Sequence, residues 1–170
     1  ELEDGDFVTI IGGNGVGKST LLNMISGLYP LDCGIITLDG ENISLQPEHQ
    51  RAKKIGRLFQ DPMLGTAGDM QILENLALAN RRGKRRGLSW GVTKEEKEQY
   101  RELVKSLNLG LEDRLTTKMG LLSGGQRQAI TLLMATLQKP KLLLLDEHTA
   151  ALDPATSAKV LKLTNEIITK

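Results

Sequence analysis

A glycine-rich stretch at residues 12–20 constrains the fold of this chain more than any other feature. Its letters, G-G-N-G-V-G-K-S-T, fit the pattern G-x-x-x-x-G-K-[ST]. Residues 6–11 before it predict a short buried strand, and residues 21–25 after it predict a helix. A plain glycine-rich turn is the alternative. The order of strand, loop, Lys-Ser and helix instead favours a phosphate-binding loop at a nucleotide site.

The chemistry of such a loop explains its residue types. Glycines let the backbone curl around a polyphosphate, and the following helix directs the positive end of its dipole at the anion. We expect Lys18 to reach the β- and γ-phosphates and the Ser19 hydroxyl to bind Mg²⁺. The residues expected to bind the nucleotide in this stretch are Gly12, Gly13, Asn14, Gly15, Val16, Gly17, Lys18, Ser19 and Thr20.

Composition sets limits on the class of protein. The chain has 170 residues, of which 39% are apolar and 25% charged, as expected of one globular domain. The net charge of +1 provides no overall field to recruit nucleic acid or an anionic membrane. The single cysteine, Cys33, excludes an internal disulfide. The aliphatic run at residues 142–145 is far too short to span a bilayer.

The first third of the chain reads as alternating helices and strands. Residues 34–43 predict a strand closed by the Asp39-Gly40 pair, a strong hairpin signal. Residues 46–51 are polar and predict a short exposed helix or loop. Residues 55–59 alternate into another strand, which a following proline stops.

The character changes over residues 61–120, which read as a mainly helical insertion. Residues 71–80 have apolar positions at helical spacing, with Asp69 as a candidate cap. Residues 93–108 predict a second helix that opens with a Thr-x-x-Glu capping box. The basic run at residues 81–86 is typical of a solvated loop more than of a nucleic-acid site, because the chain as a whole is neutral.

Two acids follow the most apolar strand of the chain. Residues 141–145 predict a fully buried strand, and Asp146 and Glu147 come directly after it. Ligands of open parallel sheets bind beyond the carboxyl ends of the strands, which places these acids beside the phosphate loop. We expect Asp146 to hold Mg²⁺ and Glu147 to act as general base on water. Solvated acids at an exposed strand end are the alternative.

A third motif has no role in a generic phosphate-loop protein. Residues 122–126, L-S-G-G-Q, resemble the signature of the ABC (ATP-binding cassette) ATPases. Gln60, at the end of a strand, matches the Q-loop glutamine of that family, and residues 151–153 match its D-loop. With the loop at 12–20 and the acids, these five motifs stand in the family's order, and the resemblance covers essentially the whole chain.

The resemblance implies a fold and an assembly. The fold class is α/β, a three-layer phosphate-loop NTPase core at residues 1–60 and 121–170 with a helical subdomain inserted at about 61–120, all in one domain, 1–170. Two such domains are expected to dimerise head to tail, as a homodimer or with a close paralogue. The γ-phosphate of an ATP held by one domain would then be capped by the signature of the other. Its residues are Ser123, Gly124, Gly125 and Gln126.

The resemblance also implies function and partners. It predicts an ATPase subunit that uses ATP and Mg²⁺ to power solute transport at the cytoplasmic face of a membrane. Gln60 would contact Mg²⁺ or the attacking water and sense the neighbouring subunit. Transmembrane permease subunits are the expected partners, with a solute-binding protein in systems that use one, and no nucleic acid is expected.

The chain departs from the family pattern at two positions. His148 stands where proline is usual, and Ala150 where serine is usual. The adenine-stacking aromatic residue and the switch histidine of the family are expected outside residues 1–170, so the chain reads as part of a longer polypeptide. Two competing functions remain: a non-transport relative acting on DNA or in translation, and a regulatory module that holds ATP without hydrolysing it.

Overall fold

The computed structural model of the chain describes residues 1–84 and 91–146. The elements follow in the order α1 (Lys18–Ser26), β1 (Thr37–Leu38), β2 (Glu41–Asn42), α2 (Glu48–Arg51), β3 (Ile55–Leu58), α3 (Ile72–Asn80), α4 (Lys94–Lys105), the 3₁₀ helix η1 (Met119–Leu121), α5 (Gly124–Thr136) and β4 (Leu142–Leu145). Helices and strands are thus mixed along the chain, and the run from α3 to α5 is helical, as the sequence pattern predicts for an α/β chain with a helical insertion.

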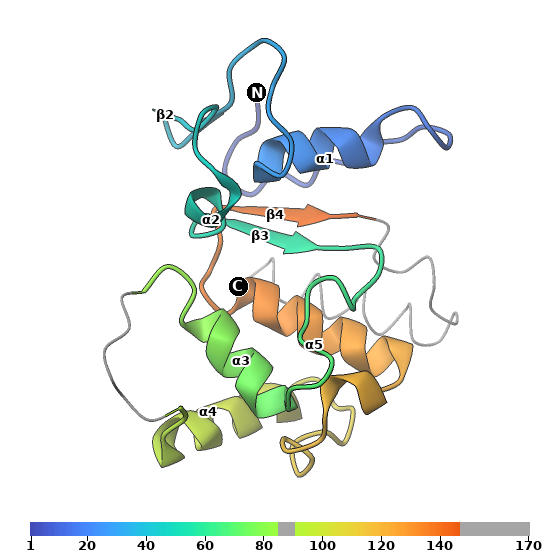
Figure 1. Cartoon of the computed structure of the whole chain (residues 1–170), viewed down its shortest axis with the longest axis vertical. Coiled ribbons are helices and arrows are strands. Elements are labelled where there is room, and N and C mark those ends of the chain that lie inside the picture. The colour runs from blue at the N-terminus through green and yellow to red at the C-terminus, as the bar shows by residue number, and fades with distance from the viewer. Residues whose placement is uncertain (85–90, 147–170) are drawn as a thin grey trace.

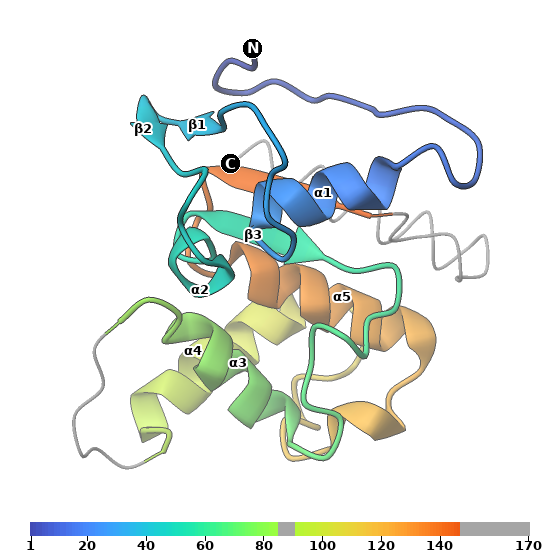
Figure 2. The same cartoon turned by 45° about the horizontal axis from the view of Figure 1, so that its top comes forward.

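A parallel pair of strands, β3 and β4, lies at the centre of the molecule. Ile55 is opposite Leu142 and Leu58 is opposite Leu145, so both strands end at the same edge. Helix α1 covers one face of this pair and α5 the other, with α3 and α4 packed beyond α5 (Figures 1 and 2). The order helix, sheet, helix confirms the three-layer α/β core, and the helical part lies on its α5 side.

The two faces of β3 differ because side chains alternate along a strand. Leu58 packs with Leu132 and Ala135 of α5, whereas Ile55 packs with Leu22 of α1. Gly56 faces α5, where a Cβ atom would lie 2.8 Å from the backbone oxygen of Ala135. The glycine therefore allows α5 to approach the sheet more closely than any side chain would permit.

The largest apolar cluster belongs to the helical part. Its buried members come from α3, α4, α5 and the loop between α4 and α5: Ile72, Leu76, Ala77, Tyr100, Val104, Leu107, Leu111, Leu115, Met119, Leu122, Ala129, Ile130 and Leu133. Because α5 contributes to this cluster on one side and to the cluster under the sheet on the other, it joins the two parts of the molecule.

Helix α1 is bounded by glycines at both ends. Gly17 precedes it with φ 93° and Gly27 follows it with φ 86°, left-handed values that glycine adopts without strain. The Gly27 N–H donates to the Met24 oxygen at 3.2 Å, and the next N–H reaches the Asn23 oxygen at 2.9 Å. These bonds satisfy carbonyls that the end of a helix otherwise leaves unpaired.

Arg51 completes the end of α1 and corrects one prediction. The segment 46–51 was expected to be exposed, and α2 is indeed short, but the Arg51 residue is only 3% exposed. Its guanidinium donates to carbonyl oxygens at the end of α1 and in the loop before α2: Met24 (2.7 Å), Ile25 (2.9 Å), Ser44 (2.8 Å) and Gln46 (2.8 Å). A cation at the negative end of a helix dipole is favourable, and this interaction explains the burial.

The hairpin and the capping box follow the sequence signals. Asp39 (φ 51°) and Gly40 (φ 74°) form the turn between β1 and β2, and both positive values fit a type I′ turn. Thr93 caps α4: its Oγ1 accepts the Glu96 N–H at 3.2 Å, and the Glu96 carboxylate accepts the Thr93 N–H at 2.9 Å. Both predictions are confirmed.

Two predicted helix boundaries are wrong by a few residues. Gln71, not Asp69, is the N-cap of α3, because the Glu74 carboxylate accepts the Gln71 N–H at 2.8 Å and fixes the first turn there. Helix α4 ends at Lys105 rather than 108, and Asn108 has a left-handed φ of 52° that no longer continues a helix.

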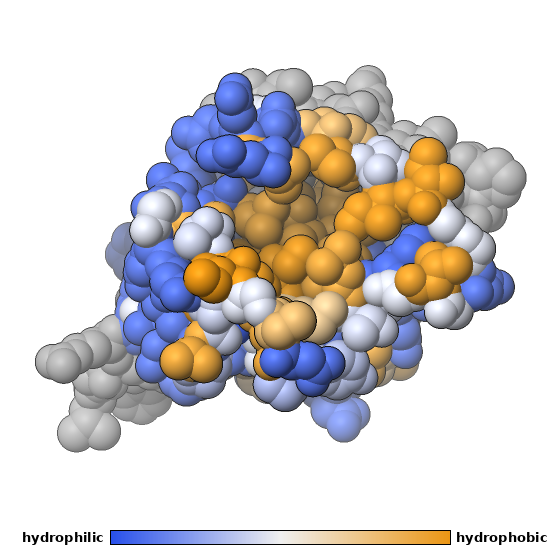
Figure 3. Space-filling model, turned by 90° about the horizontal axis from the view of Figure 1, so that it is seen from above, coloured by the Kyte–Doolittle hydropathy of each residue, from blue (hydrophilic) through white to orange (hydrophobic). Residues whose placement is uncertain are grey.

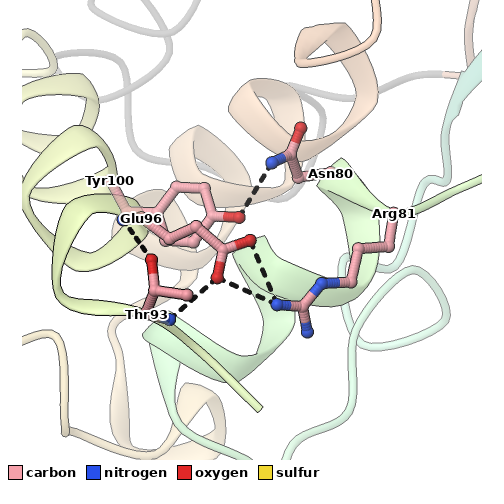
Figure 4. A network of polar contacts seen from close by, with 5 residues as sticks. All are labelled: Asn80, Arg81, Thr93, Glu96 and Tyr100. Carbon is pink, nitrogen blue, oxygen red and sulfur yellow. Dashed lines mark hydrogen bonds and ion pairs between the residues drawn. The ribbon is translucent and has the colours of Figure 1, made fainter. Parts of the chain in front are cut away.

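A polar network joins the ends of α3 and α4 (Figure 4). Asn80 donates to the Tyr100 hydroxyl at 2.9 Å and accepts from Gln138 at 2.7 Å, so it links both helices to the segment before β4. Beside it, Arg81 donates to both carboxylate oxygens of Glu96 at 3.0 and 2.9 Å. Arg81, the first residue of the basic run, is thus bound to α4.

Two predictions of buried strands are wrong. Residues 6–11 form no strand in the structure, and Phe7 and Ile11 are 68% and 90% exposed. Of β4, only Leu144 is buried, at 5% exposure. The reason is the same in both cases: in the described residues β4 pairs with β3 alone, and residues 6–11 lie outside this sheet.

The view onto the α1 side of the molecule shows that this face exposes apolar side chains (Figure 3). Apolar side chains surround a hollow on this face. The exposed large apolar residues of the N-terminal segment include Phe7, Val8, Ile10, Ile11 and Ile35. Among residues 1–84 and 91–146, no helix combines the length and apolar character needed to cross a bilayer.

Candidate functional site

The glycine-rich loop closes around the Lys18 side chain. Its Nζ donates to the carbonyl oxygens of Gly12 at 2.8 Å and Gly13 at 2.9 Å, so the ammonium lies inside the curve of the loop. A Cβ atom on Gly12 would lie 2.6 Å from Val16 Cγ2, so a side chain there would force Val16 to move. Gly17 adopts a left-handed conformation and is the N-cap of α1, so Lys18 and Ser19 are the first residues of the helix.

Ser19 and Asp146 meet across the sheet edge. The Ser19 hydroxyl donates to Asp146 Oδ1 at 3.1 Å, although the two residues are 127 positions apart. Asp146 is 9% exposed, and its own N–H donates to the Leu58 oxygen at 3.2 Å, which extends the β3–β4 ladder by one residue. The parallel strands therefore bring the acid to the N-terminus of α1.

These two side chains fit a magnesium ion. A hydroxyl and a carboxylate are hard oxygen donors of the kind that Mg²⁺ takes from proteins while it keeps waters and substrate phosphates. They lie beside a loop whose N–H groups and Lys18 suit a polyphosphate. The donor set is thus of the kind that the predicted metal and anion require, and Ser19 and Asp146 stay the expected protein ligands.

Gln60 lies at the same edge of the sheet. It follows β3 by two residues, and Asp146 follows β4 by one, so both come after paired strand ends. Gln60 is exposed, on a segment that then turns away at Asp61, whose carboxylate accepts the Met63 N–H at 2.8 Å. This position is compatible with the predicted role of Gln60 near metal or water.

The signature residues begin a helix of the helical part. Ser123 caps α5, where its Oγ accepts the Gln126 N–H at 3.3 Å and its N–H donates to Gln126 Oε1 at 3.2 Å. Ser123 and Gly124 are exposed, whereas Gly125 is buried. Arg127 fixes the turn before them through the carbonyls of Met119, Gly120 and Leu122. The motif therefore presents a helix N-terminus to solvent.

Sequence reasoning missed Arg57. From β3 it donates to Ser26 Oγ of α1 at 2.9 Å and to Asn23 Oδ1, and it stacks on the Phe59 ring with 4.4 Å between Cζ and the ring centroid. Burial lowers the pKa of the Arg57 guanidinium, and the negative charge of Asp146 opposes this shift. The signal in the sequence is a cation inside an otherwise apolar strand.

Several predicted residues lie outside the described part of the chain. These are Glu147, the expected general base, with His148 and Ala150, and the matching D-loop at residues 151–153.

The fold and this site define the class of phosphate-loop nucleoside triphosphatases: a glycine-rich loop entering a helix, its serine hydrogen-bonded to the acid that ends a parallel strand. Comparison with known proteins narrows the class. The family model described as ABC transporter matches residues 1–150. The chain belongs to the ABC transporter family of ATP-binding cassettes.

Curated relatives are ATP-binding proteins of transport systems. The chain is 48% identical over 168 residues to the tyrosine transport ATP-binding protein of Clostridioides difficile (99% of this chain, 66% of that one). It is 40% identical over 152 residues to the spermidine/putrescine import ATP-binding protein of Pasteurella multocida (89% of this chain, 38% of that one). The chain thus spans less than two thirds of the length of both relatives.

Solved structures of cassettes share the fold. A dimeric ATP-binding cassette in a post-hydrolysis state bound to ADP and Pi superposes with a TM-score of 0.81 at 31% identity, over 99% of this chain and 72% of that one. A nucleotide-free cassette of an ABC transporter gives 0.78 at 27% identity, over 98% and 68%. These neighbours agree with the α/β phosphate-loop architecture described above.

Proposed function

We propose that this chain is the ATP-binding and ATP-hydrolysing part of an ABC transporter, where it powers the movement of a solute across a membrane. The observation that carries the proposal is the hydrogen bond from Ser19 to Asp146 beside Lys18. It joins the phosphate loop to the acid that follows the apolar strand, which is the pairing that a Mg²⁺-dependent phosphoryl-transfer site needs. The names of the relatives support the transport role.

The side chains divide the work as follows. Lys18 would exchange its loop carbonyl partners for β- and γ-phosphate oxygens, while the loop N–H groups hold the rest of the polyphosphate. Ser19, Asp146 and Gln60 would hold Mg²⁺, which neutralises charge on the phosphates. Glu147 would orient the attacking water and take its proton. In the sequence, Gln60 stands between β3 and the segment that leads to α3.

A head-to-tail dimer would complete the site. One chain offers two helix N-termini suited to anions, at Lys18 of α1 and at Gly124 of α5. They belong to different parts of the molecule, and the signature faces solvent. A second copy or a close paralogue would therefore supply Ser123, Gly124, Gly125 and Gln126 to the γ-phosphate held here. The existence of dimeric cassettes among the structural neighbours supports this arrangement.

A pocket between the sheet and the helical part is the proposed contact for a permease. Its volume is about 370 Å³, and its walls come from α2, the edge of β3, α3 and α5. The lining is mostly apolar, and the Nε atoms of Arg57 and Arg82 on its walls are buried without a hydrogen-bond partner among the described residues. A partner segment with an apolar face and an acceptor oxygen would fit both features.

The remaining proposals concern organisation. Residues 1–60 and 121–170 would form the ATPase core and residues 61–120 the helical subdomain that reaches the permease, all within one domain. Such a subunit would lie peripherally at the cytoplasmic face of the membrane. A solute-binding protein would join in systems that use one.

The test is ATP hydrolysis by the full-length protein with and without Glu147→Gln. We expect hydrolysis to fall by about 10³-fold while ATP binding persists, because the amide can no longer accept the proton of water. Glu102→Gln is the matched control, since Glu102 is an exposed residue of α4 paired with Lys105 at 3.5 Å. Undiminished turnover in Glu147→Gln would exclude this residue as the base.

A second measurement separates transport from other uses of ATP. We expect ATP hydrolysis to rise when the permease subunits are added in lipid vesicles, and solute uptake to depend on Glu147. A purified protein that carries bound nucleic acid, and whose hydrolysis ignores the permease, would point instead to a non-transport relative.

A further inference from the structure

Arg57 connects two segments of the site that lie on different elements. Its Nη1 donates to Ser26 Oγ at 2.9 Å and its Nη2 donates to Asn23 Oδ1, and both acceptors belong to α1. The same guanidinium lies over the ring of Phe59, with Cζ 4.4 Å from the ring centroid. One side chain therefore touches the helix that follows the phosphate loop and the residue that follows β3.

Residues expected to act on the nucleotide stand close to both contacts of Arg57, at the start of α1 and directly after Phe59. Helix α1 begins with Lys18 and Ser19, about one to two turns before Asn23 and Ser26, which Arg57 contacts. Phe59 immediately precedes Gln60. We propose that Arg57 is a positioning residue that ties α1 to the Phe59–Gln60 segment, so that the place of Gln60 relative to Ser19 depends on it.

The chemistry of arginine suits this task. A guanidinium is planar, donates from a rigid fork and can stack on an aromatic face at the same time. Here the N–H groups of the fork donate to α1, and the flat face stacks on Phe59. A lysine at position 57 could keep the charge and one hydrogen bond, but it could not hold both acceptors and the ring in one fixed geometry.

Nearby groups keep Arg57 in its charged form. Asp146, Glu48 and Tyr29 favour the charged form of Arg57 against the burial that lowers its pKa. The neighbours of Arg57 on β3, Gly56 and Leu58, face α5 and leave the α1 side to this side chain. Arg57 thus stays cationic between α1 and the sheet edge.

The first experiment tests the tie itself. Phe59 is labelled with fluorophenylalanine in the full chain, and its fluorine signal is identified by its loss in Phe59→Leu. We expect Arg57→Met to shift this signal, and we expect Asn23→Ala to shift it too, because Asn23 Oδ1 accepts from the guanidinium that lies over the ring. An unchanged Phe59 signal in Asn23→Ala overturns the tie.

The second experiment tests its consequence for hydrolysis and rests on the proposed function. We expect Arg57→Met to lower kcat for ATP about tenfold, since small misplacements of a catalytic group have large effects, with KM within about twofold. Arg57→Lys should recover part of the loss. Arg81→Met is the control, because it removes a half-buried arginine whose partner is Glu96, away from the site.

The outcomes are distinguishable. If Arg57→Met and Arg81→Met both lower the unfolding temperature and neither changes kcat, Arg57 is structural and the positioning role is wrong. A rise in KM without a change in kcat also overturns it. If the wild-type protein shows no ATP hydrolysis with its partners, the proposed function fails, and the fluorine signal still decides whether Arg57 ties the two segments.

Discussion

The Ser19 hydroxyl and the Asp146 carboxylate lie 3.1 Å apart in one hydrogen bond, at the point where α1 begins and β4 ends. Asp146 follows β4 at the carboxyl end of the parallel pair, and α1, which packs on this pair through Leu22, begins at the same end. A single metal ion can therefore be held by two motifs that the sequence separates by 127 residues.

Loss of either Ser19 or Asp146 should remove most Mg²⁺-dependent hydrolysis. We expect Ser19→Ala and Asp146→Asn each to lower kcat by about 10²-fold or more, since both act on the charge that develops at the phosphates. The double variant should be little worse than Asp146→Asn alone, because both residues serve one ion. The measurement is ATP hydrolysis across a Mg²⁺ titration.

The control for that series is Ser106→Ala, which removes an exposed hydroxyl that bonds the Leu103 oxygen at the end of α4. Its kcat should match the wild type. Fully additive losses in the double variant would mean that Ser19 and Asp146 act independently and do not share an ion.

Gly56→Ala should destabilise the contact between β3 and α5. The added Cβ would lie 2.8 Å from the Ala135 oxygen, which is backbone and cannot move without α5. We expect the free energy of unfolding to fall by about 1–3 kcal/mol. Gly91→Ala is the matched control, since nothing lies within 4 Å of its Cβ position. Urea unfolding of both variants checks the difference, and equal stabilities would contradict it.

Arg51→Met should be among the most destabilising single changes outside the site. It removes both guanidinium bonds to the end of α1: the part-buried Ile25 oxygen loses this donor, and the Met24 oxygen keeps only the Gly27 N–H. We expect a loss of about 3 kcal/mol in the free energy of unfolding. Arg101→Met removes an exposed ion pair with Asp113 and should change stability by less than about 1 kcal/mol. A similar loss in both variants would show that Arg51 has no special role.

Tyr100 should give stability a dependence on alkaline pH. Burial raises the pKa of its hydroxyl above the ordinary value of 10.0. The folded state therefore keeps this proton more tightly than the unfolded state, so the contribution is complete below about pH 10 and declines as the pH rises toward the folded pKa. Between pH 8 and 11, the free energy of unfolding should fall more steeply with pH for the wild type than for Tyr100→Phe. Parallel curves would contradict this.

Much of the helical part and the phosphate loop was predictable because the signals there are local. The Thr93–Glu96 capping box and the Asp39-Gly40 turn specify geometry within a few residues, and the structure has both. The loop at residues 12–20 and the apolar strand before Asp146 are likewise complete patterns in one stretch. The general position of the site followed from them and from the rule for parallel sheets.

The failures share a cause that lies beyond local sequence. The apolar residues at 6–11 favour a strand, but they do not specify the strand with which the segment would pair. In the structure this segment lies exposed. The sequence pattern predicted an exposed segment around Arg51, because the carbonyl partners that bury this side chain include residues of α1, which are distant in the sequence. Arg57 was missed for that reason too, since Asn23 and Ser26 lie on another element.

At the end of α1, the residues that are acceptable at position 27 depend on the arginine at position 51. A Cβ atom on Gly27 would stand 3.0 Å from both Cδ and Nε of Arg51, in addition to the strain of a left-handed φ. Any side chain at position 27 would thus force the arginine to shift, whereas a shorter residue at 51 would leave only the left-handed φ to favour the glycine. Among descendants of this sequence, loss of the glycine should be accompanied by loss of the arginine.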